Sequence, residues 1–432
     1  METPDNAVAS YESAVKIILQ WDVSVARGQM RFDGEDHNEI NQIHCWLELT
    51  TVSDDDKSKA NSVLEKAMAW LEEEFVNILT GTGNLSLSYS TCSSPINYEL
   101  VEDDYLDYDI VPSEEKINDL QSIAERMHSV QCLQVYRGVR KDIVDMCFQR
   151  LGIEELSIED LWRLEWQVLE LKIKQWIRAA KFCVRIFFPK EKQLSKQIFA
   201  GLETVVVDFC FMEIVRDATV QLFDFVDAIS TSRLLPERLF KFMDLHEALS
   251  DLLLEVDVLF QSKSAEPIEI EVVESSIIIR AVDILSQLKE VVRGTLLQLE
   301  KEVCHEQSTT LAPVGTIHNL TRYVMDYTIR VSEYKQSITS LIVSKPSTDL
   351  KYWDDGTVID MDSIEVEGRT PLALHLIWII KNLVCKLNVK SKHYDDFDLA
   401  LTFVMDNVVY IFERIIGCPE LRMMIGYDLL KN

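Results

Sequence analysis

The sequence is poor in the residues that break a chain into short elements. It holds 13 glycines and 10 prolines among 432 residues. So few turn-forming residues argue against a β architecture rich in tight turns and favour long helices. Hydrophobic residues make up 47% of the chain, which excludes a wholly disordered protein and supplies a sizeable core. The length allows two or three compact domains or one long rod of helices.

Basic residues are scarce as well. Lysine and arginine number 43 against 72 aspartates and glutamates, which gives a formal net charge of −29. An acidic field of that size repels phosphate backbones, so we expect no nucleic-acid partner. It also weakens attraction to a membrane surface, except where basic residues gather locally.

The motifs that carry catalytic or metal chemistry are missing. The sequence has no Gly-x-x-x-x-Gly-Lys, no Gly-x-Ser-x-Gly and no His-Glu-x-x-His. Asp354-Asp355-Gly356 and Asp360-x-Asp362 lack the spacing and the bidentate glutamate of a calcium loop. We therefore predict a protein that is not an enzyme, with no catalytic residue, no cofactor and no metal site.

Signals for export or membrane insertion are missing too. The nine cysteines include no Cys-x-x-Cys pair, and the first residues, METPDNAVAS, hold neither a basic flank nor an apolar signal core. The longest strongly apolar run, from Leu372 to Cys385, is interrupted by His375 and Lys381. It is shorter than the roughly 20 residues that a membrane span needs. We expect a cytoplasmic protein in a reducing compartment.

Hydrophobic periodicity and changes in composition divide the chain into five predicted segments. These are an N-terminal helical segment (1–80), an acidic linker with interleaved tyrosines (81–115), central stacked helical bundles (116–345), an acidic loop (346–370) and a C-terminal helical segment (371–432). A solvated linker is the simpler interpretation of 81–115, and a docking or phosphorylation segment is the alternative. The predicted fold class is all-α, an elongated rod of stacked helical bundles.

One predicted helix stands out, with Ser157 as its N-cap and Pro189 closing it after Phe188. Apolar residues alternate four and three apart along it and form one seam: Trp162, Trp166, Leu169, Ile173, Trp176, Ala180, Cys183 and Phe187. A second stripe lies beside the seam and consists of Leu161, Leu164, Val168 and Leu171. Because both stripes need cover, we expect this helix inside a bundle.

Basic residues concentrate on the same helix. They include Lys172, Lys174, Arg178, Lys181 and Arg185. A solvated face that pairs with acidic neighbours is the simpler interpretation. A binding face for an anionic partner is the alternative.

A second predicted helix follows Pro313 and Gly315, and its apolar residues recur at three- and four-residue spacing. Its first residues closely resemble the most recognisable motif of the exocyst's Exo-seventy subunit family. The matching positions are Gly315, Thr316, His318, Leu320, Thr321, Arg322, Tyr323 and Tyr327. Asn319 stands where the family usually has proline, and Asp326 where it usually has asparagine. Because asparagine is a good N-cap and Asp326 lies in the second turn, we expect the helix to form regardless.

Three further stretches, 132–141, 152–194 and 236–260, resemble the plant-type members of that family. The resemblance implies a rod of helical bundles that joins other exocyst subunits and tethers secretory vesicles to the plasma membrane during exocytosis. It also implies binding to small GTPases and to phosphoinositides, and a cytoplasmic location that is peripheral at the plasma membrane.

The resemblance also implies that two parts of the family are shortened or missing here. These are the N-terminal coiled coil and the last helical domain, which carries the basic lipid-binding patch. The lysines after Pro371 form a modest cluster, namely Lys381, Lys386, Lys390 and Lys392. We therefore expect weak or absent phosphoinositide binding. The alternative function is a truncated paralogue that serves as adaptor, competitor or decoy for exocyst-binding proteins without docking to membranes.

Overall fold

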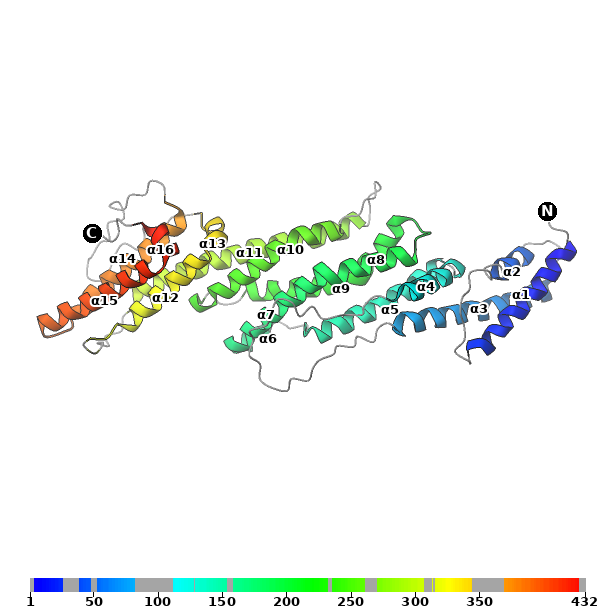
Figure 1. The fold of residues 1–432 in the computed structure, drawn as a ribbon, viewed down its shortest axis with the longest axis horizontal. Coiled ribbons are helices and arrows are strands. Elements are labelled where there is room, and N and C mark those ends of the chain that lie inside the picture. Colours follow the sequence, from blue (N-terminus) through cyan, green and yellow to red (C-terminus); the bar gives the residue numbers. More distant parts are fainter. Residues whose placement is uncertain are drawn as a thin grey trace. The chain divides into compact units, whose positions relative to one another are not determined.

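The computed structural model describes residues 4–25, 39–47, 53–81, 112–127, 129–153, 158–231, 235–260, 270–306, 313, 315–343 and 369–426. All regular structure in these ranges is helical (Figure 1), which confirms the predicted all-α class. The chain forms two compact units, each built from separate stretches of sequence. Unit 1 takes Met1–Glu155, Arg178–Leu222 and Leu254–Ile278, and unit 2 takes Leu156–Ile177, Phe223–Leu253 and Ile279–Asn432.

The helices in the first half of the chain are α1 (Pro4–Val25), α2 (Glu39–Leu47), α3 (Asp54–Gly81), α4 (Glu114–Arg126), α5 (Ser129–Arg150), α6 (Ile158–Arg163), α7 (Trp166–Phe182), the π-helix η1 (Cys183–Phe187), α8 (Phe188–Ile198) and α9 (Thr204–Ser230). The helices in the second half are the 3₁₀ helix η2 (Pro236–Arg238), α10 (Leu239–Phe260), α11 (Ile270–His305), α12 (Asn319–Glu333), α13 (Lys335–Leu341), α14 (Pro371–Ser391), α15 (Phe397–Gly417) and α16 (Pro419–Ile425). The predicted acidic linker and acidic loop lie largely outside the described residues and stay predictions.

The helix predicted from Ser157 to Phe188 is less regular and longer than expected. It breaks between α6 and α7, and Pro189 does not close it, because the chain continues through η1 into α8. The amide of Phe188 bonds to the carbonyl of Cys183, a five-residue step that interrupts the α-helical ladder just before Pro189. Pro189 thus falls in the first turn of α8, a position at which a helix tolerates proline. Ser157 lies outside the described residues.

The apolar seam of that helix is confirmed over most of its length. The members that are buried are Leu169, Ile173, Trp176, Ala180, Cys183 and Phe187. Trp166 is partly exposed, and the guanidinium of Arg238 lies 5.3 Å from the centre of its ring. The side chain of Trp162 is outside the described part.

Burial of the second stripe was predicted and is wrong for Val168 and Leu171, whose side chains are 40% and 43% exposed. Leu164, which is half-buried, sits in the break between α6 and α7, so the stripe does not run along one continuous helix. The side chain of Leu161 is outside the described part. One buried apolar seam, rather than two, therefore packs α7 against its neighbours.

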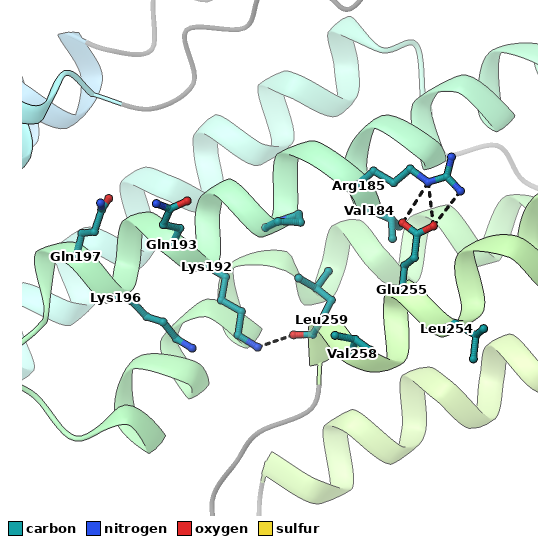
Figure 2. A pocket seen from close by; sticks show the side chains of 11 residues that line it. Val184, Arg185, Lys192, Gln193, Lys196, Gln197, Leu254, Glu255, Val258 and Leu259 are labelled. Carbon is teal, nitrogen blue, oxygen red and sulfur yellow. Dashed lines mark hydrogen bonds and ion pairs between the residues drawn. The ribbon is translucent and has the colours of Figure 1, made fainter.

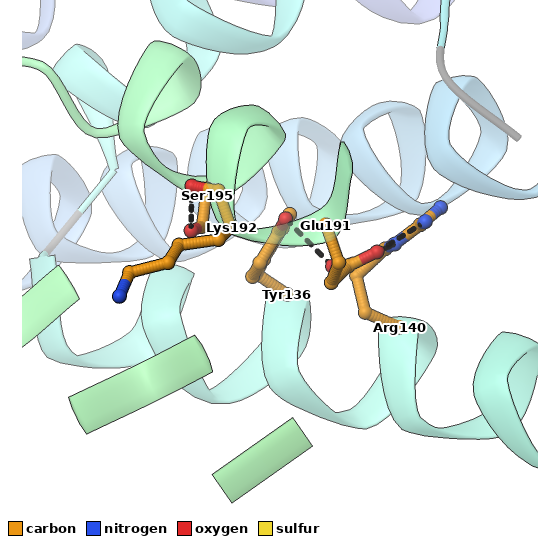
Figure 3. Close-up of polar contacts among 5 residues, drawn as sticks. All are labelled: Tyr136, Arg140, Glu191, Lys192 and Ser195. Atoms are coloured by element: carbon orange, nitrogen blue, oxygen red, sulfur yellow. Dashed lines mark hydrogen bonds and ion pairs between the residues drawn. The ribbon is translucent and has the colours of Figure 1, made fainter. Parts of the chain in front are cut away.

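A buried ion pair fastens α8 to α5 inside unit 1 (Figure 3). Arg140 and Glu191 are each 1% exposed. The Nε of Arg140 donates to both carboxylate oxygens of Glu191, at 3.1 and 3.0 Å, and its Nη2 donates to Oε2 at 2.5 Å. The hydroxyl of Tyr136, one turn earlier on α5, donates to Oε1 at 3.0 Å. Each carboxylate oxygen thus has at least one donor, as a buried charge requires.

The core of unit 2 is α14, the one helix in the described ranges that is long and apolar enough to cross a membrane by length and composition. It runs from Pro371 to Ser391 and is longer than the apolar run read from the sequence. Three buried polar side chains tie it to its surroundings. His375 pairs with Glu300 of α11, the amide oxygen of Asn382 accepts from Cys304 Sγ at 3.4 Å, and Lys390 lies 2.8 Å from Glu306. Such fixed polar partners are typical of the core helix of a bundle.

We predict that Arg140→Ala lowers the free energy of unfolding by about 3–5 kcal/mol, because it leaves the Glu191 carboxylate buried without its counter-charge. The matched control is Lys141→Ala on the same helix. Lys141 pairs with Asp217, but these side chains are 42% and 61% exposed, so we expect a loss below about 1 kcal/mol. Urea unfolding followed by circular dichroism measures both. Equal losses for the two variants would contradict the role given to the buried pair.

Candidate functional site

The residues of the family signature form the start of α12 in unit 2. Gly315 has a φ of +78°, a backbone conformation that favours glycine, and it turns the chain towards the helix. Thr316 stabilises this turn by donating its hydroxyl to the carbonyl of Pro313 at 2.6 Å. His318 is the N-cap, and its Nδ1 accepts the amide of Leu320 at 3.1 Å. The expectation that Asn319 caps the helix is wrong, because Asn319 is the first helical residue and its side chain is exposed.

A single buried amide joins this helix start to α15. Asn407 is fully buried, and its Oδ1 accepts the backbone N–H of His318 at 2.9 Å and the hydroxyl of Thr321 at 2.7 Å. Its Nδ2 donates to the carbonyl of Phe403, one turn earlier on α15, at 2.8 Å. The ring of Phe403 also meets His318 edge-on, with 6.1 Å between centroids. We call His318, Thr321 and Asn407 the amide clamp.

The other signature residues lie on the sides of α12. Tyr327 is buried, and its ring packs 5.3 Å from that of Phe240 on α10. Arg330, one turn on, places its guanidinium 4.2 Å from the centre of the same Phe240 ring. The hydroxyl of Tyr323 donates to Glu237 at 3.4 Å. Asp326, the second departure from the family motif, pairs with Arg414 of α15.

The electrostatics of this cluster do not favour reaction chemistry. Burial raises the pKa of Tyr327 and of Tyr323 far above the ordinary value, and the nearby carboxylate of Glu237 adds to both shifts. Phenols in that state stay protonated and cannot act as bases near neutral pH. Leu320 is half-buried and Arg322 is exposed. The signature therefore gathers packing and capping residues, whose combined effect is to fix α12 against its neighbours.

Of the five basic residues singled out on the sequence, Lys174, Arg178 and Arg185 are exposed, and Lys172 and Lys181 are half-buried. Lys172 and Lys174 belong to unit 2, and Arg178, Lys181 and Arg185 to unit 1. Lys174 lies 3.2 Å from Glu170, one turn earlier on α7. Arg185 donates through Nε to both carboxylate oxygens of Glu255 on α10, at 2.9 and 3.1 Å. A binding face for an anionic partner stays a prediction.

Arg185 lines a groove of about 750 Å³ between α8 and α10 in unit 1 (Figure 2). The exposed side chains of Leu254 and Val258 form one wall. The basic groups along the groove are engaged: the Nζ of Lys192 donates to the carbonyl of Leu259 at 2.6 Å, and Lys196 lies 3.2 Å from Asp208. Carboxylates therefore offset the charges of Arg185 and Lys196, whereas Lys192 is bound to a neutral carbonyl and keeps its charge.

Sequence reasoning missed Asn407, Arg140 and Glu191. Asn407 had a readable signal, because it interrupts a stripe of apolar residues spaced four apart that are all buried, namely Phe403, Ile411 and Ile415. A polar residue within such a stripe indicates a buried hydrogen bond. Glu191 and Arg140 had no comparable signal, because charged residues are abundant throughout this chain.

We predict that Asn407→Leu lowers the free energy of unfolding by at least about 2 kcal/mol, because it leaves two buried donors without an acceptor. The matched control is Asn319→Ala at the exposed first position of α12, for which we expect a change within about 0.5 kcal/mol. Urea unfolding measures both variants. A wild-type midpoint for Asn407→Leu would contradict the amide clamp.

Residues 174–432 match a family model that describes the C-terminal part of the Exo70 component of the exocyst complex. Exocyst complex component EXO70B1 of Arabidopsis thaliana is 30% identical over 405 residues, which cover 87% of this chain and 60% of that protein. Exocyst complex component EXO70B2 of the same plant is 33% identical over 318 residues, covering 72% of this chain and 49% of that protein. The chain thus spans about half to three fifths of the length of these relatives.

Among solved structures, the crystal structure of the S. cerevisiae exocyst component Exo70p matches with a TM-score of 0.64 at 12% identity. The match covers 100% of this chain and 80% of the yeast chain. At that identity the likeness concerns the fold alone. Because the family model covers more than half of the chain, and because relatives of about 30% identity match most of it, the chain belongs to the Exo70 family of exocyst subunits.

Proposed function

We propose that this protein is a non-catalytic subunit of an exocyst complex and helps to tether secretory vesicles to the plasma membrane. The observation that carries the proposal is its membership of the Exo70 family, whose Arabidopsis members EXO70B1 and EXO70B2 are named exocyst complex components. By the same family relationship, its partners would be other exocyst subunits, with small GTPases as further candidates, and it would act in the cytoplasm and at the plasma membrane.

The chemistry of the described residues supports a role in binding. Burial raises the pKa of the Cys132, Cys147 and Cys210 thiols to about 12. These thiols therefore stay protonated near neutral pH, whereas a cysteine nucleophile needs a lowered pKa. The polar clusters at Arg140 and at Asn407 are occupied by contacts within the bundle. What remains for function is the outer surface of the helices.

Membrane attachment by this chain would be weak. Of the four lysines in the C-terminal cluster, Lys390 is 6% exposed and lies 2.8 Å from Glu306. Membrane attraction amounts to roughly 1 kcal/mol for each basic residue near an anionic surface. The remaining Lys381, Lys386 and Lys392 must act within a chain of net charge −29. Recruitment through partner proteins is the better-supported route.

We predict that an affinity-tagged copy of the chain, expressed in plant cells, co-purifies with several other exocyst subunits. Mass spectrometry against a tag-only control measures their enrichment. The Asn407→Leu variant, matched for expression, tests whether recovery depends on the folded C-terminal helices, and we expect it to recover less of the complex. Absence of every other subunit from the wild-type eluate would contradict the proposal.

Two results with the purified chain test its route to the membrane and distinguish an exocyst subunit from an adaptor, competitor or decoy. Flotation with phosphoinositide vesicles at physiological salt should leave most of it in the soluble fraction. Strong, salt-sensitive flotation would contradict recruitment through partners. If the affinity purification instead recovers proteins that bind the exocyst but no other exocyst subunit, the result would favour the adaptor, competitor or decoy.

A further inference from the structure

Helix α15 carries an exposed apolar stripe beside the face that packs into its own bundle. The helix packs against α12, α14 and α16 within unit 2 (Figure 1). On another face, large apolar side chains recur at steps of four, four, three, four and four residues. They are Phe397, Leu401, Met405, Val408, Phe412 and Ile416, and their exposed fractions range from 39% to 78%. The stripe spans 20 residues of helix, about 30 Å.

The burial pattern shows that this stripe is separate from the core face of α15. The core face consists of Phe403, Asn407, Ile411 and Ile415, all buried. Scattered exposed apolar residues are ordinary on protein surfaces, but a contiguous stripe is typical of an interaction site. Steps of four and three residues are the spacing at which one helix receives another.

The charge beside the stripe limits what can cover it. Along one edge stand Asp398 and Glu413, both exposed, with Asp406 further round the helix. Between residues 395 and 418 the sequence holds one basic residue, Arg414, and that side chain pairs with Asp326. An occupant with acidic flanks would be repelled, whereas one with lysine or arginine flanks would gain attraction.

We propose that the α15 stripe is a docking surface for a basic amphipathic helix of a partner protein. The apolar residues of that helix would interdigitate with Leu401, Met405 and Phe412, and its cationic flank would lie along Asp398 and Glu413. The amide clamp supports this arrangement, because Asn407 fixes which face of α15 is turned inward and therefore which face is presented. The inference does not depend on which complex the protein joins.

Two other occupants fit the charges less well. A second copy of the chain brings the same acidic edge and a second net charge of −29, so both the local and the global fields oppose pairing. The segment 346–370 of this chain holds seven acidic residues, from Asp349 to Glu367, and two basic ones. A basic helix is the occupant that complements the surface.

Peptide binding tests the proposal directly. The probe is a fluorescein-labelled helical peptide of 21 residues, the length of α15, with leucines at the same spacing, lysines on the flanks and alanine elsewhere. A matched peptide carries glutamate in place of every lysine. Fluorescence anisotropy with the full chain should give an affinity at least about tenfold higher for the lysine peptide. Equal affinities, or no binding of either peptide, would overturn the proposal.

Variants locate the site. Leu401→Gln combined with Met405→Gln should weaken binding of the lysine peptide at least about tenfold without changing the urea midpoint, since both side chains are exposed. Ile279→Gln combined with Val282→Gln, an exposed apolar pair on α11 in the same unit, is the matched control and should bind as the wild type does. Asp398→Lys with Glu413→Lys should reverse the preference between the peptides. Binding that survives the α15 substitutions would place the peptide elsewhere and refute the proposal.

Sedimentation velocity of the wild-type chain decides the remaining alternative. We expect a monomer across the micromolar range. A concentration-dependent dimer that the Leu401→Gln, Met405→Gln variant dissolves would assign the stripe to a second copy of the chain and overturn the basic partner.

Discussion

The structure of unit 2 depends on one buried amide. An apolar stripe specifies that a helix is buried but leaves its rotation and register loosely defined, because many apolar contacts are nearly equivalent. Asn407 removes that freedom. The side-chain amide of Asn407 finds its hydrogen-bond partners only when α15 meets the start of α12 in one axial register and with one face inward. Any other arrangement leaves buried polar groups without a hydrogen bond. The same constraint determines which apolar residues of α15 remain outside.

Unit 1 uses an ion pair for the same purpose. Glu191 accepts from Arg140 and Tyr136, so α8 can pack on α5 only where these three side chains coincide. Burial lowers the pKa of Arg140, but the adjacent carboxylate more than compensates, and the pKa ends above its ordinary value. The guanidinium of Arg140 therefore remains charged throughout the physiological range. In both units the apolar seams supply most of the stabilisation, and a small polar group supplies the specificity.

The sequence predicts which face of a helix is buried, but it does not predict which helices pack against each other. The three- and four-residue steps of the seam from Leu169 to Phe187 predict its burial, because that pattern reports directly on which face turns inward. The continuation of the helix past Pro189 is not predictable in this way, because the apolar spacing does not show that the π-helix η1 precedes the proline. Asn407 bonds to residues that lie 86 and 89 positions away in the sequence, and Arg140 and Glu191 are 51 positions apart. Nothing in one sequence records such distant pairs. The signature at Gly315 to Tyr327 is recognisable as a motif, whereas its physical role becomes evident only from its contacts.

Amide hydrogen exchange at His318 tests the central constraint most directly. The first amides of a helix have no acceptor within the helix and normally exchange quickly. Here the N–H of His318 donates to Asn407 Oδ1 at 2.9 Å inside the core. We predict exchange as slow as that of the buried amides of α12 in the wild type, and faster by at least about 100-fold in Asn407→Leu, measured by exchange mass spectrometry with fragmentation to single residues. Rapid exchange at His318 in the wild type, or equal rates in the two proteins, would contradict the account.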